Sequence, residues 1–396
     1  MRTCLIAIAA FACLPSLAGA DTEVKVGFCA RTISSAAAPF AIATRMGWYA
    51  RDGIRVELVP VSGSTDCVKF VATRELPYSL PSVEPLAIIR AQGVKARIFY
   101  TAYEGNIYGI AVPDASPIGA LADLKGKSIG VTSMASGGVV VARALAASAG
   151  LNPDTDIRIV VAGEGAQTAA LLRSGQVDAL SQFDTQYAMV ENAGAKLRHL
   201  DTRAIDGFPS NGLLALEETL QKRRREAVAL AQGYAKGTVF AIANPEAAVR
   251  ILWEVYPQTR PTGKDEATAL RDDLHTLQAR IANWKLDKAG VTRWGESSER
   301  NYAAYVDFLQ QWGVIRDKVP ATDLITNDLI QEVNGFDAAQ VAAEARAWRA
   351  HCGGGTWEPV PRAAVRAPSG PGAGAAAVMA PTAGVATERA TPPGRA

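Results

Sequence analysis

Residues 24–66 read VKVGFCARTISSAAAPFAIATRMGWYARDGIRVELVPVSGSTD, and this stretch indicates the fold. The apolar segment 24–28 predicts a strand, 39–49 has the spacing of an amphipathic helix, and 55–61 alternates as a second strand. A helix between two strands at this spacing is typical of a parallel βαβ unit. The sequence therefore predicts an α/β protein.

The same alternation continues along the chain in two cycles of similar kind. The match between the cycles predicts two similar α/β lobes. In the first cycle we expect helices at 68–73 and 82–93 and strands at 76–80 and 96–100. In the second we expect strands at 110–112, 157–161, 177–182 and 196–200, helices at 137–150, 166–174 and 185–193, and a short helix followed by a strand within 121–133.

From 216 to 348 the pattern is mainly helical. Residues 217–244 predict one long amphipathic helix, and the next helix has Asn244 as its cap and Pro245 at its first position. Three further helices are expected after it. The basic run 221–225 fits a solvated helix face.

The two ends of the chain differ in composition from its middle. Residues 1–20 carry one Arg, an apolar run from Leu5 to Leu14, and Ala-Gly-Ala before a charged residue, the layout of a signal peptide cleaved after Ala20. A lipoprotein signal at Cys13 lacks the usual Leu three positions earlier. Residues 353–396 are rich in Gly, Ala and Pro without apolar periodicity, which predicts a disordered tail.

Overall charge and hydropathy narrow the functional class. The formal net charge is +2, and 48% of the residues are hydrophobic, as in an ordinary globular protein. This charge balance does not suggest a nucleic-acid partner. After the signal peptide, no segment approaches about 20 uninterrupted apolar residues, so we expect no second membrane anchor.

Four phrases occur in the order and spacing of one known family. Together they resemble the nitrate, sulfonate, taurine and thiamine-pyrimidine type of periplasmic solute-binding protein of ABC importers. The phrases are PFAIATRMGWYARDGIRVELVPVSGST at 39–65, LADLKGKSIGVTS at 121–133, LNPDTDIRIV at 151–160 and LLRSGQVDALSQFDTQYAMVENAG at 171–194.

The resemblance implies a two-lobed type II periplasmic-binding-protein fold, in which each lobe is a mainly parallel sheet flanked by helices and two crossing strands form a hinge. Lobe 1 would comprise 23–108 with 204–349, and lobe 2 would comprise 109–203. The implied function is capture of a small organic solute, such as a sulfonate, aromatic carboxylate or pyrimidine, in the cleft between the lobes. The implied partners are an ABC permease and ATPase. We expect a periplasmic monomer that is not an enzyme and carries no cofactor.

Hydroxyl and small residues follow three of the predicted strands, in loops that lead into helices. Ligands of such folds bind beyond the carboxyl ends of parallel strands, so these loops are candidate ligand contacts. Small side chains there would let an anion approach backbone N–H groups without an arginine. Each hydroxyl could equally cap its helix with no ligand. The candidates are Thr32, Ser34, Ser35, Ser64, Thr65, Asp66, Ser133, Ser136 and Gly137.

Three carboxylates could reach the same cleft. Glu84 and Asp184 lie at strand-to-helix junctions, and Glu104 lies in the expected hinge. Each could contact a ligand, pair with Lys or Arg, or cap a helix. Two unpaired carboxylates would favour a ligand with amino, amidine or hydroxyl donors over a simple anion.

Aromatic side chains are expected near the hinge and around the cleft. Tyr103, Phe183 and Tyr187 are candidate ligand contacts, and ordinary core packing is the alternative for each. A wall of Tyr and Phe would suit a flat ring. The other aromatic residues expected nearby are Tyr100, Tyr108 and Phe208.

Three cysteines follow the signal peptide. Cys29 and Cys67 fall at the ends of neighbouring predicted strands, so a disulfide between them is possible, as are two separate thiols, and Cys352 would be left over. Their spacing matches no metal site, and the three His form no ligand cluster.

Two rival functions stay open at this stage. The resemblance includes fungal-type pyrimidine synthases, enzymes that need a cysteine-rich metal-binding motif and a histidine at the site, and this sequence has neither. The other rival is a sensor that presents its closed form to a signalling receptor. The sequence does not distinguish a permease from a receptor as the partner.

Overall fold

The computed structural model describes residues 21–349. The predicted signal peptide (1–20), the predicted tail (353–396) and Cys352 lie outside the described residues. Within 21–349, no helix is both long enough and apolar enough to cross a membrane.

The first sheet has the strand order β2-β1-β3-β10-β4. β1 pairs in parallel with β2 and β3, whereas β10 is antiparallel to both of its neighbours. In β2, buried Ile54, Val56 and Leu58 alternate with exposed residues, as the sequence pattern predicts for a strand with one face in the core. The bounds are β1 Thr22–Phe28, β2 Ile54–Pro60, β3 Tyr78–Ser79, β4 Ala96–Thr101 and β10 Gly212–Leu216.

The second sheet repeats this topology in the order β7-β6-β8-β5-β9. β6 pairs in parallel with β7 and β8, and β5 is the reversed strand. Each sheet is therefore mainly parallel with one reversed strand, and the predicted two-lobed type II fold is confirmed. The bounds are β5 Ala111–Pro113, β6 Lys127–Val131, β7 Ile157–Val161, β8 Ala179–Leu180 and β9 Leu197–His199.

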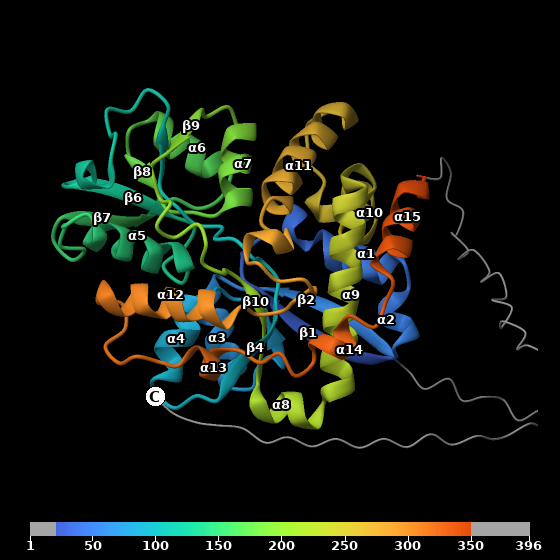
Figure 1. Ribbon diagram of the computed structural model, residues 1–396. Coiled ribbons are helices and arrows are strands. Elements are labelled where there is room, and N and C mark those ends of the chain that lie inside the picture. The colour runs from blue at the N-terminus through green and yellow to red at the C-terminus, as the bar shows by residue number, and fades with distance from the viewer. Residues whose placement is uncertain (1–20, 350–396) are drawn as a thin grey trace, which may run out of the picture. The chain divides into compact units, whose positions relative to one another are not determined.

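We call the first sheet with the helices packed on it lobe 1, and the second sheet with its helices lobe 2 (Figure 1). The chain passes from β4 to β5 through 102–110 and returns from β9 to β10 through 200–211. The predicted lobe boundaries at 108/109 and 203/204 fall within these crossing segments and stay predictions.

The helices of the two cycles follow the strands as predicted. In lobe 1 they are η1 Ser35–Ala37, α1 Ala38–Arg45, α2 Trp48–Arg51, α3 Ser64–Ala72 and α4 Val83–Arg90. In lobe 2 they are η2 Leu121–Leu124, α5 Gly137–Ser148, α6 Ala166–Arg173 and α7 Asp184–Asn192. A separate apolar core lies in each lobe, one including Val68, Leu86 and Ile98 and the other including Leu172, Leu180 and Val190.

The prediction of a single helix over 39–49 is wrong. α1 ends at Arg45 and α2 begins at Trp48, because Gly47 between them has φ +67°. Glycine adopts this left-handed conformation without the steric cost that a Cβ brings, and it commonly ends helices.

The carboxy-terminal helices differ from the prediction in number. Residues 217–244 form two helices, because the backbone at Arg223 leaves helical geometry (φ −122°, ψ 37°). Asn244 caps the next helix as predicted, its side chain accepting from Ala247 N. More than three helices then follow. The bounds are α8 Glu217–Lys222, α9 Arg224–Ala243, α10 Pro245–Val255, η3 Pro257–Thr259, α11 Glu266–Ile281, η4 Leu286–Lys288, α12 Glu299–Gln311, α13 Ala321–Leu324, α14 Ile330–Val333 and α15 Ala338–Ala347.

α11 is the helix that bridges the lobes. It packs against α10 and η1 of lobe 1 and against α7 of lobe 2. Asn192 at the end of α7 donates to the carbonyl oxygen of Asp272 and to Thr276 Oγ1, both on α11, at 2.8 and 3.2 Å. Side chains on α11 therefore face the cleft between the lobes.

Candidate functional site

Two loops close against each other at the mouth of the cleft. The loop after β2 meets the loop after β6, where Ser133 Oγ donates to the carbonyl oxygen of Ser62 at 2.6 Å and Thr65 N donates to that of Ala135 at 3.0 Å. A Cβ on Gly63 would lie 2.5 Å from the Ala135 carbonyl carbon, so only glycine permits this approach. We call this contact the seam.

An ion pair joins the lobes deeper in the cleft. Arg280 of α11 donates to the Asp184 carboxylate of α7 from Nε at 2.9 Å and from Nη2 at 2.6 Å. The two side chains are 2% and 9% exposed, and Asn283 Nδ2 also donates to Asp184 at 2.9 Å. A pair so well hydrogen-bonded is one that a low-dielectric site can hold in charged form.

The Arg280 guanidinium also lies over the Tyr103 ring, 3.9 Å from its centroid. Burial alone would lower the pKa of Arg280, but the adjacent Asp184 carboxylate raises it above its ordinary value. Arg280 is therefore a fixed cation, oriented by an ion pair on one side and by an aromatic face on the other.

A narrow cavity of about 30 Å³ lies between the lobes beside Arg280. Its walls are mostly apolar and aromatic. Asn211 contributes an amide whose Nδ2 donates to the Leu80 carbonyl oxygen at 2.8 Å and whose Oδ1 accepts from Ser210. The lining residues include Phe28, Ser34, Leu80, Tyr103, Ile107, Tyr108, Phe183, Asn211 and Arg280.

Three of the predicted contacts, Ser34, Tyr103 and Phe183, line this cavity. Several others lie where the lobes touch. Thr65 and Ser133 are at the seam, and Thr32 Oγ1 donates to Glu164 of lobe 2 at 2.5 Å. A Cβ on Gly137 would lie 2.5 Å from Ser82 Oγ and 2.9 Å from the Tyr108 hydroxyl.

The remaining predicted hydroxyls and Asp66 have positions inside one lobe or beside α11. Ser136 caps α5, its Oγ accepting from Gly138 N at 3.1 Å, which is the alternative that the sequence left open. Ser64 Oγ accepts from Ser82 N, and Ser35 Oγ donates to the Asp273 carbonyl oxygen. Asp66 lies in the first turn of α3 and does not line the cavity.

Two predicted carboxylates are buried, Glu84 in α4 of lobe 1 and Glu104 in the first crossing segment. Glu84 accepts a short hydrogen bond from the Tyr305 hydroxyl, and burial raises its pKa. Burial, assisted by Glu296, raises the pKa of Glu104 well above its ordinary value. Neither lines the cavity, so the structure does not bring either carboxyl into contact with a ligand held there.

The aromatic residues expected near the hinge lie in different surroundings. Phe208 was expected to face the hinge tyrosines, but its ring stacks on Tyr305 with 4.6 Å between centroids and packs in the lobe 1 core. Tyr100 is buried against Tyr234. Tyr187 donates to the Gly109 carbonyl oxygen at 2.8 Å and so holds the first crossing segment.

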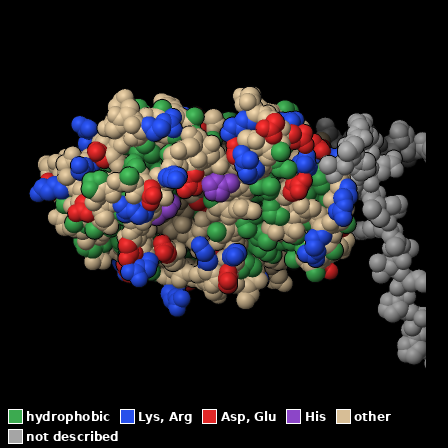
Figure 2. Space-filling model, turned by 90° about the horizontal axis from the view of Figure 1, so that it is seen from above, with side chains coloured by type: hydrophobic (Ala, Val, Ile, Leu, Met, Phe, Trp, Pro, Cys, Tyr) green, Lys and Arg blue, Asp and Glu red, His purple; other side chains and the backbone are tan. Residues whose placement is uncertain are grey.

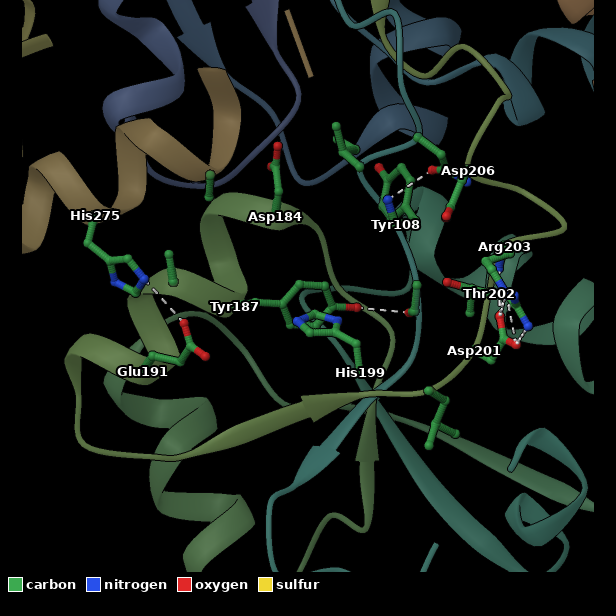
Figure 3. Close-up of a pocket in the computed structure, with 16 residues that line it drawn as sticks. Tyr108, Asp184, Tyr187, Glu191, His199, Asp201, Thr202, Arg203, Asp206 and His275 are labelled. Atoms are coloured by element: carbon green, nitrogen blue, oxygen red, sulfur yellow. Dashed lines mark hydrogen bonds and ion pairs between the residues drawn. The ribbon is translucent and has the colours of Figure 1, made fainter. Parts of the chain in front are cut away.

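A second and wider hollow of about 430 Å³ lies beside the crossing segments (Figure 3). Tyr108, Tyr187 and His199 line it, and at its edge His275 Nε2 lies 3.4 Å from Glu191. Burial, opposed by Glu191, lowers the pKa of His199. Figure 2 shows a face of the molecule where histidine borders a hollow and basic and acidic side chains are interspersed.

The cysteines of the first loop and α3 are joined. Cys29 and Cys67 form a disulfide with 5.9 Å between their Cα atoms. Cys29 also lines the cavity, so the bond ties a cavity wall to the helix that begins at the seam.

Sequence reasoning missed Arg280, Asn211 and Phe28. Arg280 lies 96 residues after its partner Asp184, in a helix with no distinguishing motif. Phe28 is the last residue of the predicted first strand. Its position at the carboxyl end of a parallel strand, where ligands bind, could have identified it as a candidate contact. Within 21–349, no group of three or more His, Cys, Asp or Glu residues could hold a metal ion.

Comparison with known proteins identifies the family. Residues 34–248, more than half of the chain, match the family described as NMT1/THI5 like. The chain belongs to the NMT1/THI5-like family. The riboflavin-binding protein RibY of Chloroflexus aurantiacus is 19% identical over 296 residues, which are 74% of this chain and 82% of RibY.

Solved structures share the fold at low sequence identity. A protein from Bordetella bronchiseptica RB50 is 22% identical with a TM-score of 0.62, and the match covers 79% of this chain and 97% of that one. The alkanesulfonate-binding protein SsuA from Xanthomonas axonopodis pv. citri, bound to MOPS, is 16% identical with a TM-score of 0.58. That match covers 78% of this NMT1/THI5-like chain and 99% of SsuA.

Proposed function

We propose that this protein is the solute-binding component of an ABC importer, which captures a small organic molecule between its lobes and closes around it. The observation that carries the proposal is the cavity beside Arg280, whose walls come from lobe 1, the first crossing segment and lobe 2. A ligand there would contact both lobes at once. It would then favour the closed form over the open one, which is the requirement for ligand-driven closure.

Direct contacts between the lobes support this proposal. The seam and the Arg280–Asp184 pair join atoms of lobe 1 directly to atoms of lobe 2, so the lobes are complementary surfaces. The crossing segments 102–110 and 200–211 are two adjacent connections that could bend together as a hinge. Opening at the hinge would expose the cavity, and closing would exclude water from it.

The proposed place of action is the periplasm, with delivery to a membrane permease and its ATPase. Residues 1–20 have the pattern of a cleaved export signal, and the chain belongs to a family that it resembles in four successive segments. The relatives differ in the ligands their names give, riboflavin for one and an alkanesulfonate for another. We propose a ligand with a flat ring, because Phe28, Tyr103, Tyr108 and Phe183 wall the cavity.

The test is a thermal-shift screen of sulfonates, aromatic carboxylates, aromatic amides and pyrimidines, followed by calorimetry of the compounds that raise Tm. A ligand at 100 times its Kd should stabilise the fold by about 2.7 kcal/mol. Mass spectrometry of the molecule released after long incubation should return the compound unchanged. If none of these compounds binds, the binding function is lost, and a chemically altered product would instead favour the enzyme.

A further inference from the structure

The charge of the cavity wall depends on one residue. Among the described residues that line the cavity, Arg280 is the one with an ordinarily charged side chain. Asp184 neutralises it through two parallel N–H···O bonds, and both members of the pair are buried. The site therefore presents a hydrogen-bonding guanidinium but almost no net charge.

The pair leaves part of the guanidinium unused. Nε and Nη2 donate to Asp184, so the ion pair does not engage Nη1. Arg280 lines the cavity and its plane is fixed over Tyr103. Nη1 is thus an oriented donor available to an acceptor atom of a ligand beside the aromatic wall.

Helix amino termini could in principle supply the missing positive potential for an anion. At the start of α7, however, the Asp184 carboxylate itself accepts from Thr185 N at 2.7 Å, and Asp184 N donates to the Ile107 carbonyl oxygen. At the start of α5, Gly138 N is bonded to Ser136 Oγ. At the start of α3, Thr65 N is bonded across the seam. These four donors already have partners, and η1, whose start lines the cavity at Ser34 and Ala36, is a 3-10 turn of three residues and not an α-helix.

We propose that the ligand is an uncharged planar molecule whose hydrogen-bond acceptor is bound by Arg280 Nη1, and that Asp184 sets this preference by cancelling the arginine charge. The inference rests on the proposed binding function and specifies its ligand class. A carboxylate or sulfonate would bring an uncompensated charge into a dry site, which is costly, whereas a carbonyl, amide or ring nitrogen would not. Asp184 thus weakens the binding of anionic ligands, and it orients the Arg280 Nη1 donor that binds neutral ones.

The test compares ligands that differ only in charge. Calorimetry would measure Kd for three pairs: benzamide and benzoate, nicotinamide and nicotinate, and benzenesulfonamide and benzenesulfonate. For the wild-type protein, we expect the neutral member of a pair to bind at least about tenfold more tightly. Asp184→Asn should move the ratio at least about tenfold toward the anion, because Arg280 would then carry an uncompensated charge.

A matched control removes the same charge elsewhere in lobe 2. Asp114 is exposed, in the loop after β5, and Asp114→Asn should leave the neutral-to-anion ratio unchanged. The inference is overturned if wild type prefers the anions, or if folded Asp184→Asn binds with an unchanged ratio. If Asp184→Asn does not fold, the inference is tested by the wild-type protein alone, through the ratio of its Kd values for the neutral and the anionic member of each pair. Failure of every pair to bind would overturn this inference, and the binding function would be overturned with it only if the wider thermal-shift screen also found no ligand. An anion preference would overturn the inference and leave the binding function intact.

Discussion

The backbone N–H of Thr65 in the first turn of α3 donates to the carbonyl oxygen of Ala135 in lobe 2 at 3.0 Å. The first N–H groups of an α-helix have no partner within their own helix. The closed lobes supply that partner here, so this bond exists only while the seam is shut. The Thr65 amide is therefore hydrogen-bonded in the closed form and loses this bond when the lobes open.

Gly63→Ala should prevent the seam from closing. The new Cβ would lie 2.5 Å from the Ala135 carbonyl carbon and oxygen, which are backbone atoms that cannot rotate away. We predict unchanged circular dichroism but ligand binding weakened at least about tenfold, or about 1.4 kcal/mol. Gly119→Ala is the control, because Gly119 is exposed in lobe 2 and a Cβ there would meet only Asp123 Oδ2, at an ordinary contact distance of 3.6 Å. Equal Kd values for Gly63→Ala and wild type would show that the seam has no part in binding.

Glu84→Gln should change how stability depends on pH. Burial raises the folded-state pKa of Glu84, so its contribution is fully present below the unfolded-state pKa and is lost as pH rises through the folded value. Gln stays neutral and keeps an oxygen for the Tyr305 hydroxyl. The variant should therefore gain stability relative to wild type as pH rises, by about 1.4 kcal/mol for each unit of pKa shift.

Urea unfolding at about pH 4.5 and about pH 7.5 measures this difference. Glu75→Gln serves as a control for removal of a carboxylate from an exposed position. A free-energy difference between Glu84→Gln and wild type that does not vary with pH would mean that burial does not raise the pKa of Glu84.

Loss of the Cys29–Cys67 disulfide should destabilise lobe 1. The bond closes a loop with a sequence separation of 38 residues, and removal of a native disulfide costs about 2–5 kcal/mol in small exported domains. We expect Cys29→Ser with Cys67→Ser to lower the urea midpoint, and reductant to lower that of wild type but not of the double variant. Alkylation of both cysteines in unreduced wild type would contradict the bond.

Thr32→Ala should have little effect on binding. Its hydroxyl crosses the cleft to Glu164, but the contact is exposed and water can replace it. Exposed polar contacts of this kind contribute up to about 1 kcal/mol, so Kd should change by less than about fivefold. Calorimetry with the ligand found in the screen measures this. A loss as large as that expected for Gly63→Ala would instead mean that the rim of the cleft dominates closure.

The order of strands and helices could be predicted because each element has its own short-range pattern of apolar and polar residues. The alternation of 55–61 gave the second strand, and the first cycle and the second gave the same topology. The errors occurred where one residue changes the backbone. Gly47 separates α1 from α2 through its positive φ, and Arg223 separates α8 from α9.

The candidate site was harder to predict because its key contact is not local. The sequence identified Asp184 as a carboxylate at a helix start, yet its partner Arg280 lies in a helix of the carboxy-terminal region. The hydroxyl loops were found in the right places, but most of their groups bond to the other lobe or to their own helices. The periodicity of apolar residues predicts which face of a helix is buried. It does not predict which residues that face contacts.

The most direct test of ligand-driven closure is hydrogen exchange at the Thr65 amide, followed by NMR with and without a saturating compound from the screen. Closure around the ligand should slow exchange at Thr65 at least about tenfold, and Gly63→Ala should abolish this slowing. The amide of Val56, within β2, should exchange at the same rate in both states and serves as the internal reference. Unchanged exchange at Thr65 in a protein shown by calorimetry to be saturated would contradict capture by closure of the lobes.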